Sequence, residues 1–220
     1  AFAAVEATVR TLTELGHHVE ELPQAPFDDA ALARDFLLTW FVYTAWELAD
    51  TKRRTGAGDD AFERDTLILA ALGRATGSVD YLDAVHRRHA HTRRLTEFFE
   101  THDLLLTPTL ATPPPRIGQF DLPAALERAS DVLIKTRTAG LLRFTKFVDD
   151  AVEQNLAWVP YTQLANLTGR PAISLPLHWT ADGLPLGVQF VAPLAGEQTL
   201  IRLAAQLEEA MPWADRVPPL

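Results

Sequence analysis

The sequence predicts an α/β protein in which a mixed β-sheet is flanked by helices. Three observations support this class. A helical apolar pattern that stops at Gly16 precedes a short alternating segment, an unbroken apolar run ends at Pro108, and two apolar runs near the C-terminus are joined by an Asp-Gly pair. No linker composition and no repeat divides the chain, so residues 1–220 are expected to belong to a single domain.

The first element is an amphipathic helix followed by a short strand. Its apolar residues recur at helical spacing, at Phe2, Val5, Val9, Leu12 and Leu15. Gly16 then ends the helix, because glycine readily adopts the left-handed conformation found after helix C-termini. Residues 18–22 alternate polar and apolar side chains and predict a strand that ends at Pro23.

The middle of the chain predicts further helices. Residues 28–50 form an aromatic-rich helical stretch, and a second helical run covers residues 60–73. Ser78 is placed to cap a long helix that runs to about His102. Residues 121–150 show a weaker helical period.

Three apolar runs predict the remaining strands of the sheet. Residues 103–107 contain the uninterrupted apolar run Leu104–Leu106, which is typical of a buried parallel strand. Residues 171–177 and 186–191 flank an Asp-Gly pair at 182–183, which favours a tight turn with positive φ. These last two runs are therefore expected to pair as antiparallel neighbours.

Glycines and prolines mark the boundaries of the C-terminal elements. The prolines of the "TPPPRIG" segment, residues 112–118, predict an irregular loop. A short helix is expected before Gly169, and a final amphipathic helix from Gly196 to about Met211. Gln189 lies among the apolar residues of a strand, so its amide must find local partners if it is buried.

Composition and charge narrow the function. With 47% hydrophobic residues, the chain can build a sizeable core. The net charge of −9 disfavours nucleic acid and anionic membranes as partners. The absence of cysteine excludes disulfides, thiolate zinc sites and a cysteine nucleophile. No apolar run has the length of a membrane span and no signal peptide is evident, so a cytoplasmic location is the default expectation.

Serine is a poor candidate for a nucleophile within this chain. The three serines are Ser78, Ser130 and Ser174. A nucleophile elbow needs small neighbours and a sharp strand-to-helix turn, whereas Ser174 lies in a predicted strand between Ile173 and Leu175. We therefore expect no serine triad built on this residue.

Histidines and carboxylates form no convincing site. His86 and His89 lie three residues apart on one helical face, but no third ligand with matching spacing follows and no HExxH pattern is present. We expect a solvated basic face with His89 partly packed, and no metal. Asp149, Asp150 and Glu153 are expected to be surface charges, because no pocket signal accompanies them.

The C-terminal region carries a more specific pattern. The stretch "QLANLTGRPAISLPLHWTADGLPLGVQFVAPLAGEQTLIRLAAQLEEAMPW" resembles the C-terminal end of the amidase signature family. The family's motif positions fall on Asn166, Thr168, Gly169, Pro171, Ala172, Leu175, Pro176, Gly183, Leu184, Pro185, Gly187, Gln189, Glu208, Glu209, Pro212 and Trp213. "DLLLTPTLATPPPRIG" resembles the family's Asp-x-Leu-Leu-x-Pro-Thr segment, and "VEATVRTLTELGHHVEEL" its helix-and-strand unit soon after the catalytic core. Residues 28–75 and 120–157 show no such match.

The resemblance implies an amide hydrolase that works through a serine acyl-enzyme. The family uses a serine nucleophile, a second serine in a cis peptide and a lysine, all in its N-terminal half. This chain has no Gly/Ser-rich segment of that kind, and Lys52, Lys135 and Lys146 match none of the motif positions. We therefore expect residues 1–220 to be the C-terminal portion of a single amidase signature domain, with no catalytic residue, no cofactor and no metal. The chain alone is expected to be inactive.

The partners expected from the resemblance are the missing N-terminal half and, in the complete enzyme, a small linear or cyclic amide. Trp40, Tyr43 and Trp158 are candidates for the lining of the substrate pocket, and ordinary core packing is the equal alternative. The "TPPPRIG" loop is a further candidate for approaching the site. The family spans too many amides for the sequence to choose one.

A second hypothesis is a non-catalytic binding or regulatory module built on the same half-fold. The chain begins at Ala1 without methionine, which favours truncation over such a module. Half of a sheet should also leave an open edge and an apolar patch beside residues 103–107 and 171–177, and such surfaces promote association, for example as a homodimer.

Overall fold

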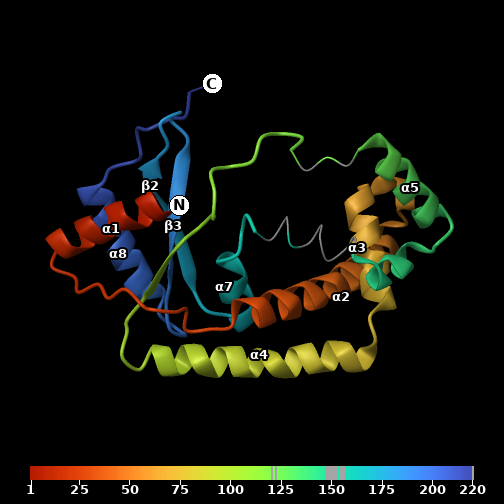
Figure 1. The fold of residues 1–220 in the computed structure, drawn as a ribbon, viewed down its shortest axis with the longest axis horizontal. Coiled ribbons are helices and arrows are strands. Elements are labelled where there is room, and N and C mark those ends of the chain that lie inside the picture. Colours follow the sequence, from red (N-terminus) through yellow and green to blue (C-terminus); the bar gives the residue numbers. More distant parts are fainter. Residues whose placement is uncertain (120, 122, 147–152, 154–156, 220) are drawn as a thin grey trace. The chain divides into compact units, whose positions relative to one another are not determined.

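The computed structural model describes residues 1–119, 121, 123–146, 153 and 157–219 (Figure 1). These residues form two compact units that interleave along the sequence. The sheet unit comprises Ala1–Leu32, His89–Arg116 and Leu156–Leu220, and the helical unit comprises Ala33–Arg88 and Ile117–Asn155. The boundaries fall within the long helices α2 (Asp29–Thr55) and α4 (Ser78–Phe98). That both units belong to one domain remains a prediction.

The sheet unit contains a three-stranded sheet with the order β1-β3-β2. Its strands are β1 (Leu105–Pro108), β2 (Ala172–Trp179) and β3 (Pro185–Val191). The predicted hairpin is confirmed: β2 and β3 pair antiparallel, and Gly183 in the turn has φ of 77°. The helices and sheet confirm the α/β class.

Both strand pairs within this chain are antiparallel, so the prediction of β1 as a parallel strand was wrong, and the sheet is not mixed among the strands described. The unbroken apolar run of β1 has another cause. Leu106 packs into one core cluster and Leu105 into a second cluster on the opposite face. Burial on both faces removes the polar alternation whichever way the neighbouring strand runs.

The predicted strand at residues 18–22 is not formed. Helix α1 (Phe2–Glu14) ends as expected, with φ of 91° at Gly16, but residues 17–22 are irregular. Val19 and Leu22 still pack against the core, which accounts for the apolar pattern. A strand also needs a neighbour for its backbone hydrogen bonds, and among the described residues the ladders join β1, β2 and β3.

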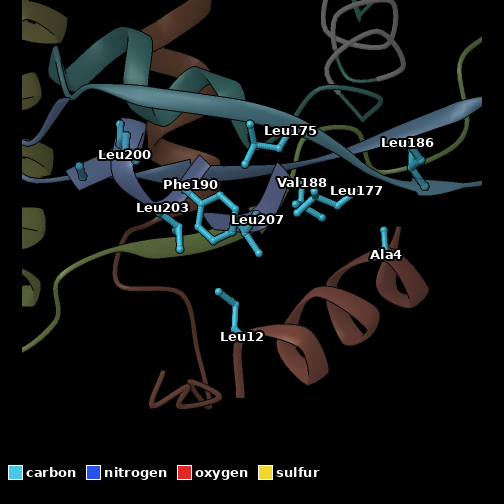
Figure 2. Packing of buried hydrophobic residues seen from close by; sticks show 11 residues of the cluster. Ala4, Leu12, Leu175, Leu177, Leu186, Val188, Phe190, Leu200, Leu203 and Leu207 are labelled. Carbon is cyan, nitrogen blue, oxygen red and sulfur yellow. The ribbon is translucent and has the colours of Figure 1, made fainter. Parts of the chain in front are cut away.

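One face of the sheet is covered by α1 and by α8 (Glu197–Ala210), which form the first core cluster (Figure 2). Alternate residues of β3 point into it, because side chains of a strand alternate between faces. Figure 2 shows the Phe190 ring among leucines from α8 and β2. The buried members are Ala4, Leu12, Leu175, Leu177, Leu186, Val188, Phe190, Ala192, Leu200, Leu203 and Leu207.

The second core cluster lies on the opposite face, at one end of β1 and β3. It combines strand residues with α7 (Thr162–Thr168) and the C-terminal half of α4. Its buried members are Leu32, Leu95, Leu105, Leu164, Leu167 and Val191. Gly169 ends α7 with φ of 68°, as its position predicted.

The helical unit contains α3 (Arg64–Ala75), α5 (Ala124–Lys135) and two short 3₁₀ segments, Asp59–Ala61 and Ala139–Phe144. The predicted helices at residues 28–50 and 60–73 correspond to α2 and α3. The helix predicted over 121–150 is α5 followed by a 3₁₀ segment, and its last residues lie outside the described ranges.

Helix α4 ends at Phe98 rather than near His102, and Ser78 is its first helical residue rather than its cap. The first backbone hydrogen bond runs from the Tyr81 amide to the Gly77 carbonyl. Ser78 therefore lies one position too late to cap the helix.

Close backbone packing and ion pairs hold the helical unit together. Among the described residues, its core cluster contains Leu48, Leu67 and Ala70, with Ala45, Phe62 and Ile134 packed against it. A Cβ on Gly73 of α3 would lie 1.9 Å from the Phe41 carbonyl oxygen of α2, so these helices touch at the glycine. Arg64 of α3 bridges to two carboxylates of α5, at 2.8 Å from Asp131 and 3.0 Å from Glu127.

Candidate functional site

The open half of the second sheet face carries polar and small residues. We call this set the open-face residues: Thr107, Thr109, Ser174, Gly187 and Gln189. The register places Thr107 opposite Gln189 on one side of β3, and Ser174 opposite Gln189 on the other. The sheet therefore has one face that is apolar throughout and one that turns from apolar to polar along the strands.

Gln189 anchors the covered end of this polar region. It is 5% exposed, and its Nε2 donates to Thr107 Oγ1 at 3.3 Å and to the Tyr161 carbonyl at 3.2 Å. This confirms that the buried amide finds local partners. Burial raises the pKa of the nearby Tyr161 hydroxyl, and the charge of Asp29 adds to the effect.

Gly187 lets two hydroxyls meet across the central strand. A Cβ at this position would lie 2.7 Å from Ser174 Oγ and 2.9 Å from Thr109 Oγ1. Without it, these two oxygens form a hydrogen bond of 2.6 Å over β3. The requirement for glycine here is one of space, since Gly187 has no positive φ.

Ser174 has the environment of a structural hydroxyl. It lies within β2, and its hydrogen-bond partner is the Thr109 hydroxyl, which cannot act as a general base. A serine nucleophile needs an adjacent base and an exposed, sharp turn. That no triad is built on this residue stays a prediction.

The apolar patch predicted beside residues 103–107 and 171–177 stays a prediction, because apolar side chains there, such as Leu106 and Ile173, are partly exposed. The exposed residues of β2 in this region are Ala172 and Ser174, and the large exposed apolar side chains of the described chain lie elsewhere. The uncovered part of this face is the part that carries hydroxyl groups.

An aromatic groove lies in the helical unit. Its volume is about 340 Å³, and we call its lining the groove residues: Trp40, Tyr43, Thr44, Glu47, Leu48, Thr51, Phe62 and Thr66. Trp40 and Tyr43, two of the predicted pocket residues, thus line the same groove with 45% and 57% of their surfaces exposed. Trp158 belongs to the sheet unit and does not line it; its carbonyl accepts a hydrogen bond from the Ala111 amide.

Sequence reasoning missed Glu47 and Phe62 as groove residues. Residues 40, 43, 44, 47 and 51 follow helical spacing along one face of α2, so the period could have added Glu47. Phe62 comes from outside the helix, and no sequence signal connects it to the groove. Tyr43 also contacts Tyr81 of α4, and burial, followed by the interaction with Tyr43, raises the pKa of Tyr81.

Within the described residues, the histidine and carboxylate candidates form no metal site. His86 and His89 are both exposed on α4, and the buried histidine of this helix is His91, contrary to the expectation for His89. Within the described ranges, no group of three or more His, Cys, Asp or Glu side chains could hold a metal. Asp149 and Asp150 lie outside the described residues.

No helix in the part of the chain that the structure describes is long and apolar enough to cross a lipid bilayer.

The fold and the motif residues define a class of protein. The amidase family profile matches residues 2–201, and the chain belongs to the amidase family. This confirms the resemblance carried by residues 163–213. The open-face residues Gly187 and Gln189 are two of the motif positions, and the geometry above gives each a physical reason.

Several relatives and solved structures are similar to the chain. The amidase-family protein AmiC of Mycobacterium leprae is 36% identical over 212 residues, which cover 94% of this chain and 39% of that protein. The 6-aminohexanoate-cyclic-dimer hydrolase of Pseudomonas sp. strain NK87 is 30% identical over 224 residues, which cover 99% of this chain and 42% of that protein. A solved structure of 6-aminohexanoate cyclic dimer hydrolase superposes with a TM-score of 0.76 at 27% identity, over 98% of this chain and 42% of the other. The chain thus spans about two fifths of the length of these relatives.

Proposed function

We propose that this chain is the part of an amidase that supports and completes an active site whose nucleophile lies in another segment of the whole protein. The reaction is hydrolysis of the carbon–nitrogen bond of a linear or cyclic amide. One observation carries the proposal: the family match extends over nearly the whole chain, yet the chain spans only 39–42% of its relatives. The alternative, an independent binding or regulatory module, is not favoured, because the relatives are amidases and amide hydrolases.

The proposed chemistry divides the work between the two parts. A serine oxygen outside this chain attacks the amide carbonyl carbon, the carbon–nitrogen bond breaks, and the leaving nitrogen takes a proton. Water then attacks the ester, releases the carboxylic acid and returns the proton to the serine. This chain contributes a rigid sheet, because an active site needs supporting elements that hold its reacting groups in place.

The open-face residues support this division. Among the described residues, no apolar cluster covers the part of the face where they lie, and their side-chain groups are hydrogen-bond donors and acceptors rather than bases. We also propose Trp40, Tyr43 and Trp158 as residues of the acyl pocket. For Trp40 and Tyr43, the support is their shared, exposed position on one groove.

Complementation tests the proposal. The 220-residue chain, the in-frame segment that precedes Ala1 and the two together are assayed with a simple aryl amide, and a serine-directed covalent inhibitor is located by mass spectrometry. We expect hydrolysis only from the combination, with the adduct on the added segment. The Ser174→Ala chain should complement as well as the wild type.

Two outcomes would overturn the proposal. Hydrolysis by the chain alone that is lost in Ser174→Ala would indicate a self-sufficient serine hydrolase. Binding of the added segment without hydrolysis of any amide would favour a regulatory module. A cytoplasmic location and a homodimeric state belong to the same proposal and are measured by cell fractionation and analytical ultracentrifugation.

A further inference from the structure

The aromatic groove of the helical unit combines ring faces with a carboxylate. Trp40, Tyr43 and Phe62 supply the rings, and Glu47 lies on the same face of α2, one turn after Tyr43. Leu48 also lines the groove and is a buried member of the helical unit's core cluster. A volume of about 340 Å³ suits a small organic molecule.

Glu47 has no ion-pair or hydrogen-bond partner among the residues that the structure describes, and it is exposed. Glu47 is the acidic residue of the groove lining, and three nearby carboxylates of this unit are already paired: Asp50 with two arginines, Asp59 with Lys52 and Asp131 with Arg64. A single unpaired carboxylate beside aromatic rings gives the groove a net negative charge. An anionic ligand would be repelled there.

The Phe62 ring already contacts the ammonium group of a lysine. Lys52 Nζ lies over the Phe62 ring, 5.4 Å from its centroid, and is ion-paired with Asp59. This pair adds no net charge, so the charge of Glu47 is not cancelled. Trp40 and Tyr43 have exposed surfaces on the groove, and tryptophan is the ring that binds cations most strongly.

We propose that this groove binds the ammonium end of a small organic amine. The cation would lie against the Trp40 and Tyr43 rings with Glu47 as its counter-ion, while the alkyl part contacts Leu48 and Phe62. The Thr44 hydroxyl donates to the Trp40 carbonyl at 2.8 Å, so it does not compete with the ammonium as a donor to Glu47. If the groove serves as a subsite for amine-bearing amides or for a released amine, that role rests on the proposed function. Binding of the ammonium group itself does not depend on it.

Titration of the 220-residue chain with n-hexylammonium chloride and with the neutral alcohol 1-hexanol tests the site, at constant ionic strength. The signal is the shift of the Trp40 indole N–H in the NMR spectrum, assigned by a Trp40→Leu variant. We expect saturable binding of the ammonium, about fivefold tighter than the alcohol, since an exposed ion pair and a cation–π contact each contribute modestly. Glu47→Gln should remove this preference.

Two controls make the result decisive. Glu6→Gln removes an exposed carboxylate of α1 and should leave both affinities unchanged. Trp40→Leu keeps an apolar residue but removes the ring, so it should weaken ammonium binding about fivefold and alcohol binding less. Circular dichroism checks that each variant keeps its helix content.

The proposal is overturned if neither ligand shifts Trp40, or if the alcohol binds as tightly as the ammonium and Glu47→Gln changes nothing. Its failure is separate from failure of the proposed function. Complementation on a neutral aryl amide does not involve an ammonium group, and ammonium binding is measured on the chain without any hydrolysis.

Discussion

The two units of this chain are stabilised in different ways. The sheet unit buries two apolar clusters, one on each face of a three-stranded sheet. In the helical unit, the described residues form a smaller core cluster around Leu48, Leu67 and Ala70, and a glycine contact and ion pairs join its helices. Apolar burial involves no titratable group, whereas exposed ion pairs are screened by salt and lost when their carboxylates are protonated. The two units should therefore respond differently to the same perturbation.

The first and largest effect is expected in the core of the sheet unit. Phe190 is 2% exposed and lies among the leucines of α8 and β2 (Figure 2), so Phe190→Ala should cost about 3–5 kcal/mol of the free energy of unfolding. Urea denaturation followed by circular dichroism measures it. Phe2→Ala removes a ring that is 79% exposed and should change stability by less than about 0.5 kcal/mol. Equal effects would show that the apolar cluster does not stabilise the unit.

Within the sheet unit, the sequence predicted the turn and the helix ends better than the strand pairing. The Asp-Gly turn and the helix end at Gly169 are local signals, because each needs a particular backbone conformation at one residue. Strand pairing is not local. The direction of β1 and the irregular state of residues 17–22 depend on which strand lies alongside, and no pattern within either segment encodes that.

The second prediction concerns the helix contact in the helical unit. Gly73→Ala should destabilise the chain by about 2 kcal/mol, because a Cβ would meet the Phe41 carbonyl and push α2 from α3. The helix propensity of alanine favours the opposite sign by about 1 kcal/mol, so the measured sign decides between contact and propensity. Arg74→Ala, at the next and exposed position of α3, is the matched control. A more stable Gly73→Ala chain would rule out the contact.

The candidate site could be predicted only in part. The aromatic residues Trp40 and Tyr43 stand out by type and spacing, and their shared groove follows from the helical period. The role of Gly187 could not be predicted, because the Thr109 and Ser174 hydroxyls that need its space come from two other strands. Phe62 likewise reaches the groove from a segment outside α2.

The third prediction uses pH to separate the units. Arg64 hydrogen-bonds Asp131 and holds its pKa below the usual 3.8, so this contact stabilises the folded chain above pH 3.8 and is lost as pH falls through the lowered pKa. Arg64→Met should therefore destabilise the chain at pH 6, by less than Gly73→Ala, and have little effect near pH 2. Urea denaturation at both pH values and fixed ionic strength measures this. Arg10→Met on α1 should show no such pH dependence, and a difference that grows at low pH would contradict the assignment.

The smallest effect is expected at the hydroxyl pair of the open face. Ser174→Ala removes the 2.6 Å hydrogen bond to Thr109 at an exposed position, where water can replace the lost partner, so the cost should be about 0.5 kcal/mol. Gly187→Ala should cost more, since its Cβ would meet both oxygens, and the double variant Gly187→Ala/Ser174→Ala should recover part of that loss. Urea denaturation of the three variants measures this coupling. Additive losses would mean that Gly187 is not there to make room for the hydroxyl pair, and the open face would then owe its glycine to a contact made by another part of the whole protein.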